Sequence, residues 1–139
     1  MKKIFLSFLI CTFALFSIQV AEATTSYDKS GRKTASYKTS GNTITKYNKY
    51  GQKEATYKKS GSTTTSYDKS GRKTGSYRTS GSTTTSYDKY GRKTGSYRTS
   101  GNTTTSYDKS GRKTGSFKKN SNGTITEYDK YGRKVGTYR

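Results

Sequence analysis

A ten-residue period inside a twenty-residue repeat constrains the possible fold of this chain more than any other feature. Tyrosine recurs at residues 27, 37, 47, 57, 67, 77, 87, 97 and 107, and glycine at 31, 41, 51, 61, 71, 81, 91, 101 and 111. The first half of a unit reads Tyr-Asp-Lys-x-Gly-Arg-Lys, and the second half reads Tyr-x-x-Ser-Gly followed by a threonine run. Because a unit of this size cannot bury a core alone, the period predicts an array whose units depend on their neighbours.

The first half of each unit carries the residues of a tight turn. In Asp28-Lys29-Ser30-Gly31, Asp suits position i of a type I turn and Gly suits a following bulge with positive φ. Asn48 replaces Asp in the second unit, which keeps the turn chemistry and removes the charge. We therefore interpret these residues as turn-forming rather than catalytic: Asp28, Gly31, Asp68, Gly71, Asp88, Gly91, Asp108, Gly111, Asp129 and Gly132.

Between the turns lie segments of about six residues, such as 72–77 and 82–87, rich in the strand-favouring residues Thr and Tyr. They predict an all-β fold, an array of short antiparallel β-hairpins with roughly eleven or twelve strands. We expect the array to form a meander or a coiled, solenoid-like sheet.

Aliphatic side chains are nearly absent from the repeats. Apart from alanines, residues 24–139 contain only Ile44, Ile125 and Val135. If the chain folds, tyrosines must supply the packing that large apolar side chains usually provide. Disorder is the alternative, because low hydrophobicity and high net charge are typical of disordered chains.

The turn chemistry also predicts which side chains share a face. A type I turn with a glycine bulge would place Tyr67 opposite Arg72, within reach of a cation–π contact. Strand alternation would then put Tyr77 on the other face. Tyrosines 27, 47, 67, 87 and 107 would line one face, and 37, 57, 77 and 97 the other. We expect coiling or stacking to cover at least one of these rows.

The N-terminus has the layout of a secretory signal peptide, with a signal helix, over residues 1–23. Lys2 and Lys3 precede an uncharged apolar run from Ile4 to Val20, and Ala21-Glu22-Ala23 provides a cleavage site at Ala21 and Ala23. An uncleaved membrane anchor is the alternative, although the run is short for a span. Cleavage would leave residues 24–139, about 5.5 copies of the repeat, with no integral membrane span. We expect an exported bacterial protein, periplasmic or extracellular.

The last copy, residues 116–139, is atypical. Phe117 replaces tyrosine, and the segment 118–123 holds one extra residue, which moves the last tyrosines to 128 and 138. Asn122-Gly123 is a hairpin turn signal in its own right. Terminal repeats are often atypical because they cap an array, and a special binding site is the alternative.

The unit Tyr67-Asp68-Lys69-Ser70-Gly71-Arg72 resembles the YD repeat of bacterial Rhs and teneurin-like proteins, whose signature is Tyr-Asp-x-x-Gly-Arg. It matches at 27–32, 67–72, 87–92, 107–112 and 128–133, and loosely at 47–52. The resemblance implies a β-sheet array that spirals into a shell, with a surface or glycan-binding role. This chain departs from the pattern by having lysine, such as Lys73, where the family has an aliphatic residue after Gly-Arg.

Composition argues against catalysis. The chain has no histidine, and its single cysteine, Cys11, lies in the signal segment. Cleavage would leave seven acids, five of them in equivalent turns, which do not form a paired general acid and base. Zinc ligands and the Asp-rich pattern of calcium repeats are missing. We therefore expect no enzyme activity, no cofactor and no metal.

Charge indicates the class of partner. The full chain has 28 Lys and Arg against 8 Asp and Glu, a net charge of +20, and cleavage would leave +19. The electric field of such a net charge attracts polyanions. Lysine-rich strands also stay soluble without any ligand, which is the alternative reason for the charge. We expect a structural or surface-interaction role. The alternatives are a fibre-forming matrix subunit, with self-association, and a module that binds acidic polysaccharide, lipopolysaccharide or extracellular nucleic acid. The candidate ligand-binding residues are Tyr27, Arg32, Tyr67, Arg72, Tyr87, Arg92, Tyr107 and Arg112.

Overall fold

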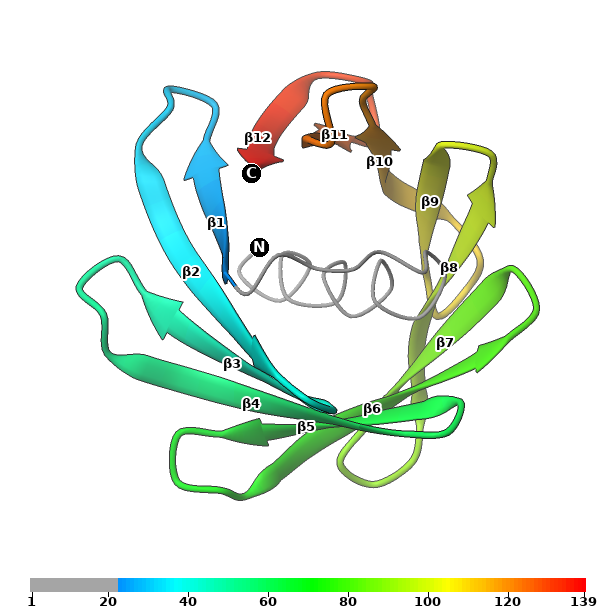
Figure 1. Ribbon diagram of the computed structural model, residues 1–139. Coiled ribbons are helices and arrows are strands. Elements are labelled where there is room, and N and C mark those ends of the chain that lie inside the picture. Colours follow the sequence, from blue (N-terminus) through cyan, green and yellow to red (C-terminus); the bar gives the residue numbers. More distant parts are fainter. Residues whose placement is uncertain (1–22) are drawn as a thin grey trace.

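The computed structural model describes residues 23–139, which form a closed barrel of twelve antiparallel strands (Figure 1). The predicted signal helix and Ala21 lie outside the described residues. No helix within residues 23–139 has the length and apolar character needed to span a bilayer. The strands are β1 (Ala23–Asp28), β2 (Lys33–Ser40), β3 (Thr43–Asn48), β4 (Lys53–Ser60), β5 (Thr63–Asp68), β6 (Lys73–Ser80), β7 (Thr83–Asp88), β8 (Lys93–Ser100), β9 (Thr103–Asp108), β10 (Lys113–Lys119), β11 (Ile125–Asp129) and β12 (Lys134–Tyr138).

The all-β class and the regular antiparallel hairpins are confirmed, whereas the open meander or solenoid-like sheet is wrong. The last strand pairs with the first, Ser26 opposite Tyr138 and Asp28 opposite Gly136. Thr25 and Arg139 also exchange backbone hydrogen bonds, at N···O distances of 2.7 and 2.9 Å. An open sheet would leave two strand edges without partners, and closure pairs both of them.

Two kinds of turn alternate along the chain. In the first kind, Gly31 N donates to Asp28 O at 3.0 Å, and Asp28 N donates to Arg32 O at 2.9 Å. Gly31 has φ +77°, a value that favours glycine. The second kind has two residues between strands, as at Gly41-Asn42, where the glycine φ is +53° and the asparagine φ is negative. That combination is typical of the type II′ turn, which matches the twist of a hairpin.

The register at the first kind of turn differs from the prediction by one residue. Tyr67 lies opposite Lys73, not Arg72. The reason is that Asp68 N donates a hydrogen bond to Arg72 O at 2.9 Å, which pairs Asp68 with Arg72. A β-bulge follows at Thr74, since Ser66 already pairs with Gly75. The bulge brings Thr74 Oγ1 to within 2.9 Å of Ser66 Oγ, to which it donates a hydrogen bond. The predicted face-to-face pair of Tyr67 and Arg72 is therefore wrong.

Barrel closure buries one of the two tyrosine rows. Tyr37, Tyr57 and Tyr97 are at most 6% exposed and Tyr77 is partly buried, whereas the row that contains Tyr67 is half-buried on the outside of the barrel. Strand alternation thus separates the rows as the sequence predicts. Nearer the first kind of turn, the inner face carries small residues such as Ser66 and Gly75.

The extra residue in the last copy changes the type of one turn. Asn120 N donates to Thr124 O at 2.8 Å and Gly123 N donates to Asn120 O at 3.0 Å, the same pattern as in the Asp turns. Gly123 has φ +81°. The insertion therefore replaces a two-residue turn by a longer bulged turn between β10 and β11, and the inward and outward alternation of the strands is preserved.

Candidate polyanion-binding rim

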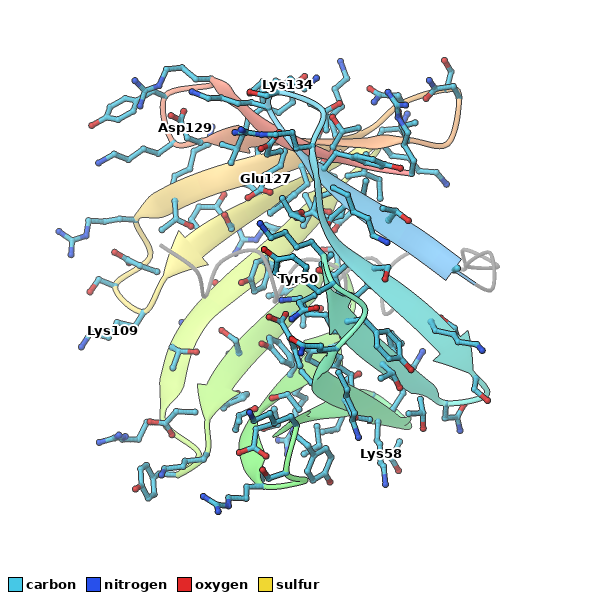
Figure 2. All side chains as sticks on the ribbon, turned by 90° about the vertical axis from the view of Figure 1, so that its left-hand side faces the viewer. Tyr50, Lys58, Lys109, Glu127, Asp129 and Lys134 are labelled. Carbon is cyan, nitrogen blue, oxygen red and sulfur yellow. The ribbon has the colours of Figure 1, made fainter. Side chains whose placement is uncertain are left out.

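The six Asp-type turns lie together at one end of the barrel, because each joins an odd-numbered strand to the next even-numbered one. We call this end the basic rim; it comprises residues 28–33, 48–53, 68–73, 88–93, 108–113 and 129–134. Of the 26 Lys and Arg residues within 23–139, 17 belong to the basic rim, and all 17 are exposed. Five of the seven Asp and Glu residues also lie there, so the basic rim has a net charge of 17 − 5 = +12. Figure 2 shows Lys109 and Asp129 on this side and Lys58 on the opposite side.

The rim carboxylates form hydrogen bonds and ion pairs within their own turns. Asp88 Oδ1 accepts hydrogen bonds from the backbone N–H groups of Tyr90 and Arg92 at 2.9 and 3.0 Å. The Arg92 Nε donates to Asp88 Oδ2 at 2.7 Å. The Arg92 backbone N–H and then its side chain hold the pKa of Asp88 below its usual value. The same Asp–Arg pair recurs at residues 28 and 32, 108 and 112, and 129 and 133.

Asn48 shows that the turn needs the side-chain oxygen and not the charge. Its Oδ1 accepts from the N–H groups of Tyr50 and Gln52, both at 2.9 Å, as the Asp oxygens do. Its Nδ2 donates to Gln52 Oε1 at 2.9 Å, in place of the Asp–Arg ion pair. These turns therefore set the position of the lysines and arginines beside them, and their carboxylates have a structural role.

The predicted ligand residues do not form the pairs that the sequence reasoning assigned. Tyr27, Tyr67, Tyr87 and Tyr107 are half-buried on the outside wall, whereas Arg32, Arg72, Arg92 and Arg112 are exposed on the basic rim. The cations above the wall tyrosines come from the opposite end of the barrel. Lys58 Nζ lies 5.7 Å from the Tyr67 ring centre, and Arg139 lies 5.7 Å from that of Tyr27.

Three other tyrosines belong to the basic rim and were missed. Tyr50, Tyr90 and Tyr131 are 75%, 71% and 71% exposed, the largest exposed apolar surfaces of residues 23–139. They occupy alternate turns, and Ser30, Ser70 and Ser110 occupy the others. This forty-residue alternation of Tyr and Ser is visible in the sequence and is the signal that distinguishes the rim tyrosines.

Each rim tyrosine stacks with cations from its own turn. Lys49, Lys89 and Lys130 each place Nζ 4.8 Å from the ring centre of the tyrosine that follows. Arg92 and Arg133 lie 5.2 and 5.1 Å from the rings of Tyr90 and Tyr131. Three units of an exposed ring with adjacent cations are therefore spaced around one end of the barrel, an arrangement suited to stacking and to charge contact.

A cavity of about 580 Å³ lies on the basic rim where the first and last hairpins meet. Lys29, Arg32, Arg133 and Lys134 line it, together with the two carboxylates that pair with the arginines. It exists only when the barrel is closed, because its lining comes from both ends of the chain.

Residues 23–139 contain no group of three or more His, Cys, Asp or Glu side chains placed to hold a metal ion. The basic rim presents exposed tyrosine rings with lysine and arginine side chains beside them. No protein-family model and no curated protein matches the chain.

Proposed function

We propose that this chain is a non-enzymatic, exported barrel protein that binds polyanions through the basic rim. The observation that carries the proposal is the concentration of 17 of 26 cations at one end of the barrel. Export is inferred from the signal-peptide layout of residues 1–23. Acidic polysaccharide, lipopolysaccharide and extracellular nucleic acid are the candidate partners.

The rim geometry supports binding by many weak contacts. Six equivalent turns present their cations around a ring, so neighbouring anionic groups of one polymer chain meet neighbouring turns. Repeated weak contacts raise the overall affinity by increasing the effective concentration of the next group. The rim tyrosines add flat surfaces on which sugar faces or bases stack.

Closure of the barrel weighs against the fibre alternative. Every strand from β1 to β12 is paired on both sides, so the closed form offers no strand edge for addition of another chain. A fibre would require the β1–β12 pairing to open. The relationship to YD repeats stays a proposal; its support is the recurring Tyr-Asp-x-x-Gly-Arg turn and the surface role that the resemblance implies.

A matched pair of charge-reversal variants tests the proposal. The rim variant carries Lys29→Glu, Lys69→Glu and Lys109→Glu, and the control carries Lys38→Glu, Lys58→Glu and Lys118→Glu at the opposite end; all six lysines are exposed. Heparin binding is measured by isothermal titration calorimetry across a series of salt concentrations. We expect the rim variant to lose affinity about tenfold or more and to show a shallower salt dependence, because fewer counterions are released. The control should lose much less.

Equal losses in the two variants would mean that net charge alone attracts the polymer. Binding by the unmodified protein that does not change with salt would contradict the proposal outright, since contacts to a polyanion release counterions. Circular dichroism of both variants establishes that the sheet is retained.

A further inference from the structure

The departures of the last copy from the repeat converge on one cavity. A cavity of about 420 Å³ opens at the basic rim and extends to the inner face of β9 to β12. Phe117, Glu127 and Val135 line it. At the corresponding positions most other copies have Tyr, Ser and Thr, as at Tyr97, Ser106 and Thr114; the second copy instead has Lys46 and Glu54, which form an ion pair. The last copy therefore places one acid and two apolar side chains around a single space.

The inner end of the cavity holds one buried acid among apolar groups. Glu127 is 4% exposed and Phe117 is 1% exposed. Tyr138 Oη donates to Glu127 Oε2 at 3.0 Å, so a ligand would meet the other oxygen, Oε1. The Ser106 and Thr114 hydroxyls in the lining are hydrogen-bonded to each other at 2.9 Å. Glu127 is thus the acidic group that this end offers to a ligand.

The outer end has the opposite character. Lys130, Tyr131 and Arg133 line the mouth, and the exposed Tyr131 ring has both cations beside it. Asp129 also lines the mouth, but its Oδ2 is bound to Arg133 Nε at 2.7 Å. Figure 2 shows Asp129 at the turn and Glu127 deeper along the barrel. A ligand that spans the cavity therefore meets cations outside, apolar walls in the middle and a hydrogen-bonding carboxyl inside.

We propose that this cavity binds a small amphipathic organic anion that carries a hydroxyl group at the end opposite its acid. The hydroxyl would donate to Glu127 Oε1, the apolar body would pack against Phe117 and Val135, and the acid group would lie between Lys130 and Arg133. The volume is within the range of small-molecule sites. A ligand amine at the mouth would meet the two cations, which disfavours it. The mouth of this site shares Lys130, Tyr131 and Arg133 with the basic rim, whereas its inner residues Phe117, Glu127 and Val135 lie outside the rim.

Three related probes test the assignment: 4-hydroxyphenylacetate, phenylacetate and tyramine. The first has both groups, the second lacks the hydroxyl, and the third replaces the acid by an amine. Binding to the purified protein is measured by saturation-transfer NMR and by titration calorimetry. We expect 4-hydroxyphenylacetate to bind at least tenfold more tightly than either of the others.

The variant Phe117→Tyr, Glu127→Ser and Val135→Thr gives the last copy the residues that most other copies have in the same barrel. We expect it to lose 4-hydroxyphenylacetate binding at least tenfold and to keep its heparin affinity. A second variant, Lys130→Ser, alters only an exposed turn residue. It should weaken 4-hydroxyphenylacetate binding severalfold and leave the melting temperature unchanged.

Absence of saturable binding, equal binding of all three probes, or full retention of binding in the triple variant would overturn the proposal. Heparin titrations of the unmodified protein and of the triple variant, which changes no residue of the basic rim, report on the rim independently. Probe binding without heparin binding would leave this site standing and remove the proposed polymer function.

Discussion

Tyr138 Oη on β12 donates a 3.0 Å hydrogen bond to Glu127 Oε2 on β11, and both side chains are almost fully buried inside the barrel. Burial raises the pKa of Glu127 to about 7, although the hydrogen bond from Tyr138 acts in the opposite direction. A carboxyl with a raised pKa binds its proton more tightly in the folded barrel than in the unfolded chain. The contribution to stability is therefore fully present at acid pH and is lost as the pH rises.

The first prediction concerns this pH dependence. From an unfolded value near 4.5 to a folded value of about 7, ionisation of Glu127 should lower the free energy of unfolding by up to about 3 kcal/mol. Glu127→Gln should abolish that part of the profile. Urea unfolding of both proteins between pH 4 and pH 8 gives their free energies of unfolding. The difference between the two proteins at each pH isolates the contribution of Glu127. Parallel profiles for the two proteins would show that Glu127 does not titrate in this range.

The second prediction compares two buried tyrosines. At pH 8, where Glu127 is largely ionised, Tyr138→Phe removes its donor and should destabilise the barrel by about 1.5–3 kcal/mol, the usual range for a hydrogen bond to a charged group. Among residues 23–139, Tyr57 Oη has no hydrogen-bond partner, and Tyr57 is 1% exposed. Tyr57→Phe should therefore be neutral or stabilise by about 1 kcal/mol. Phe117 already occupies an equivalent position in the repeat. Equal destabilisation by both changes in thermal melts would contradict this account.

Local chemistry was predictable from the sequence, whereas closure was not. The Asp28 and Gly31 pattern identifies a turn because both residue types have a specific conformational role there. The meeting of Ser26 with Tyr138 depends instead on twist and tilt summed over twelve strands, to which no single residue type points. The register was wrong by one residue because the bulge at Thr74 has no distinctive sequence signal.

The candidate sites show the same division. Lysines and arginines in the turns were visible in the sequence, but their gathering at one end follows from the alternating strand directions of the barrel. Phe117 and Val135 were visible as departures from the repeat, and their convergence with Glu127 on one cavity required the fold. Tyr50 lies outside the ten-residue tyrosine period, and only the forty-residue alternation with Ser30 and Ser70 distinguishes its position.

The third prediction tests the turn chemistry. Asp88→Ala removes the acceptor for the N–H groups of Tyr90 and Arg92 and should lower the urea midpoint of unfolding. Asp88→Asn should lower the midpoint much less, because Asn48 accepts the same two hydrogen bonds in its own turn. The comparison uses urea unfolding at neutral pH. A large loss for Asp88→Asn would assign the stability to the exposed Asp88–Arg92 ion pair, which is usually worth little.

The fourth prediction separates the rim tyrosines from those of the outside wall. The variant Tyr50→Ser, Tyr90→Ser and Tyr131→Ser places serine in turns whose neighbours Ser30, Ser70 and Ser110 already have it, so the fold should be retained. Stacking on an exposed ring contributes about 1–3 kcal/mol per base. Affinity for a single-stranded DNA oligonucleotide, followed by fluorescence anisotropy, should therefore fall by about tenfold or more with an unchanged salt dependence, because no cation is removed.

The matched control is Tyr27→Ser, Tyr67→Ser and Tyr107→Ser, which changes half-buried rings outside the basic rim. If it folds, as circular dichroism would establish, it should bind the oligonucleotide as the unmodified protein does. The opposite result, with binding lost in the control and kept in the rim variant, would move the site to the outside wall. There Lys58 and Arg139 supply the cations next to Tyr67 and Tyr27, so the end of the barrel opposite the basic rim would have to contact the ligand.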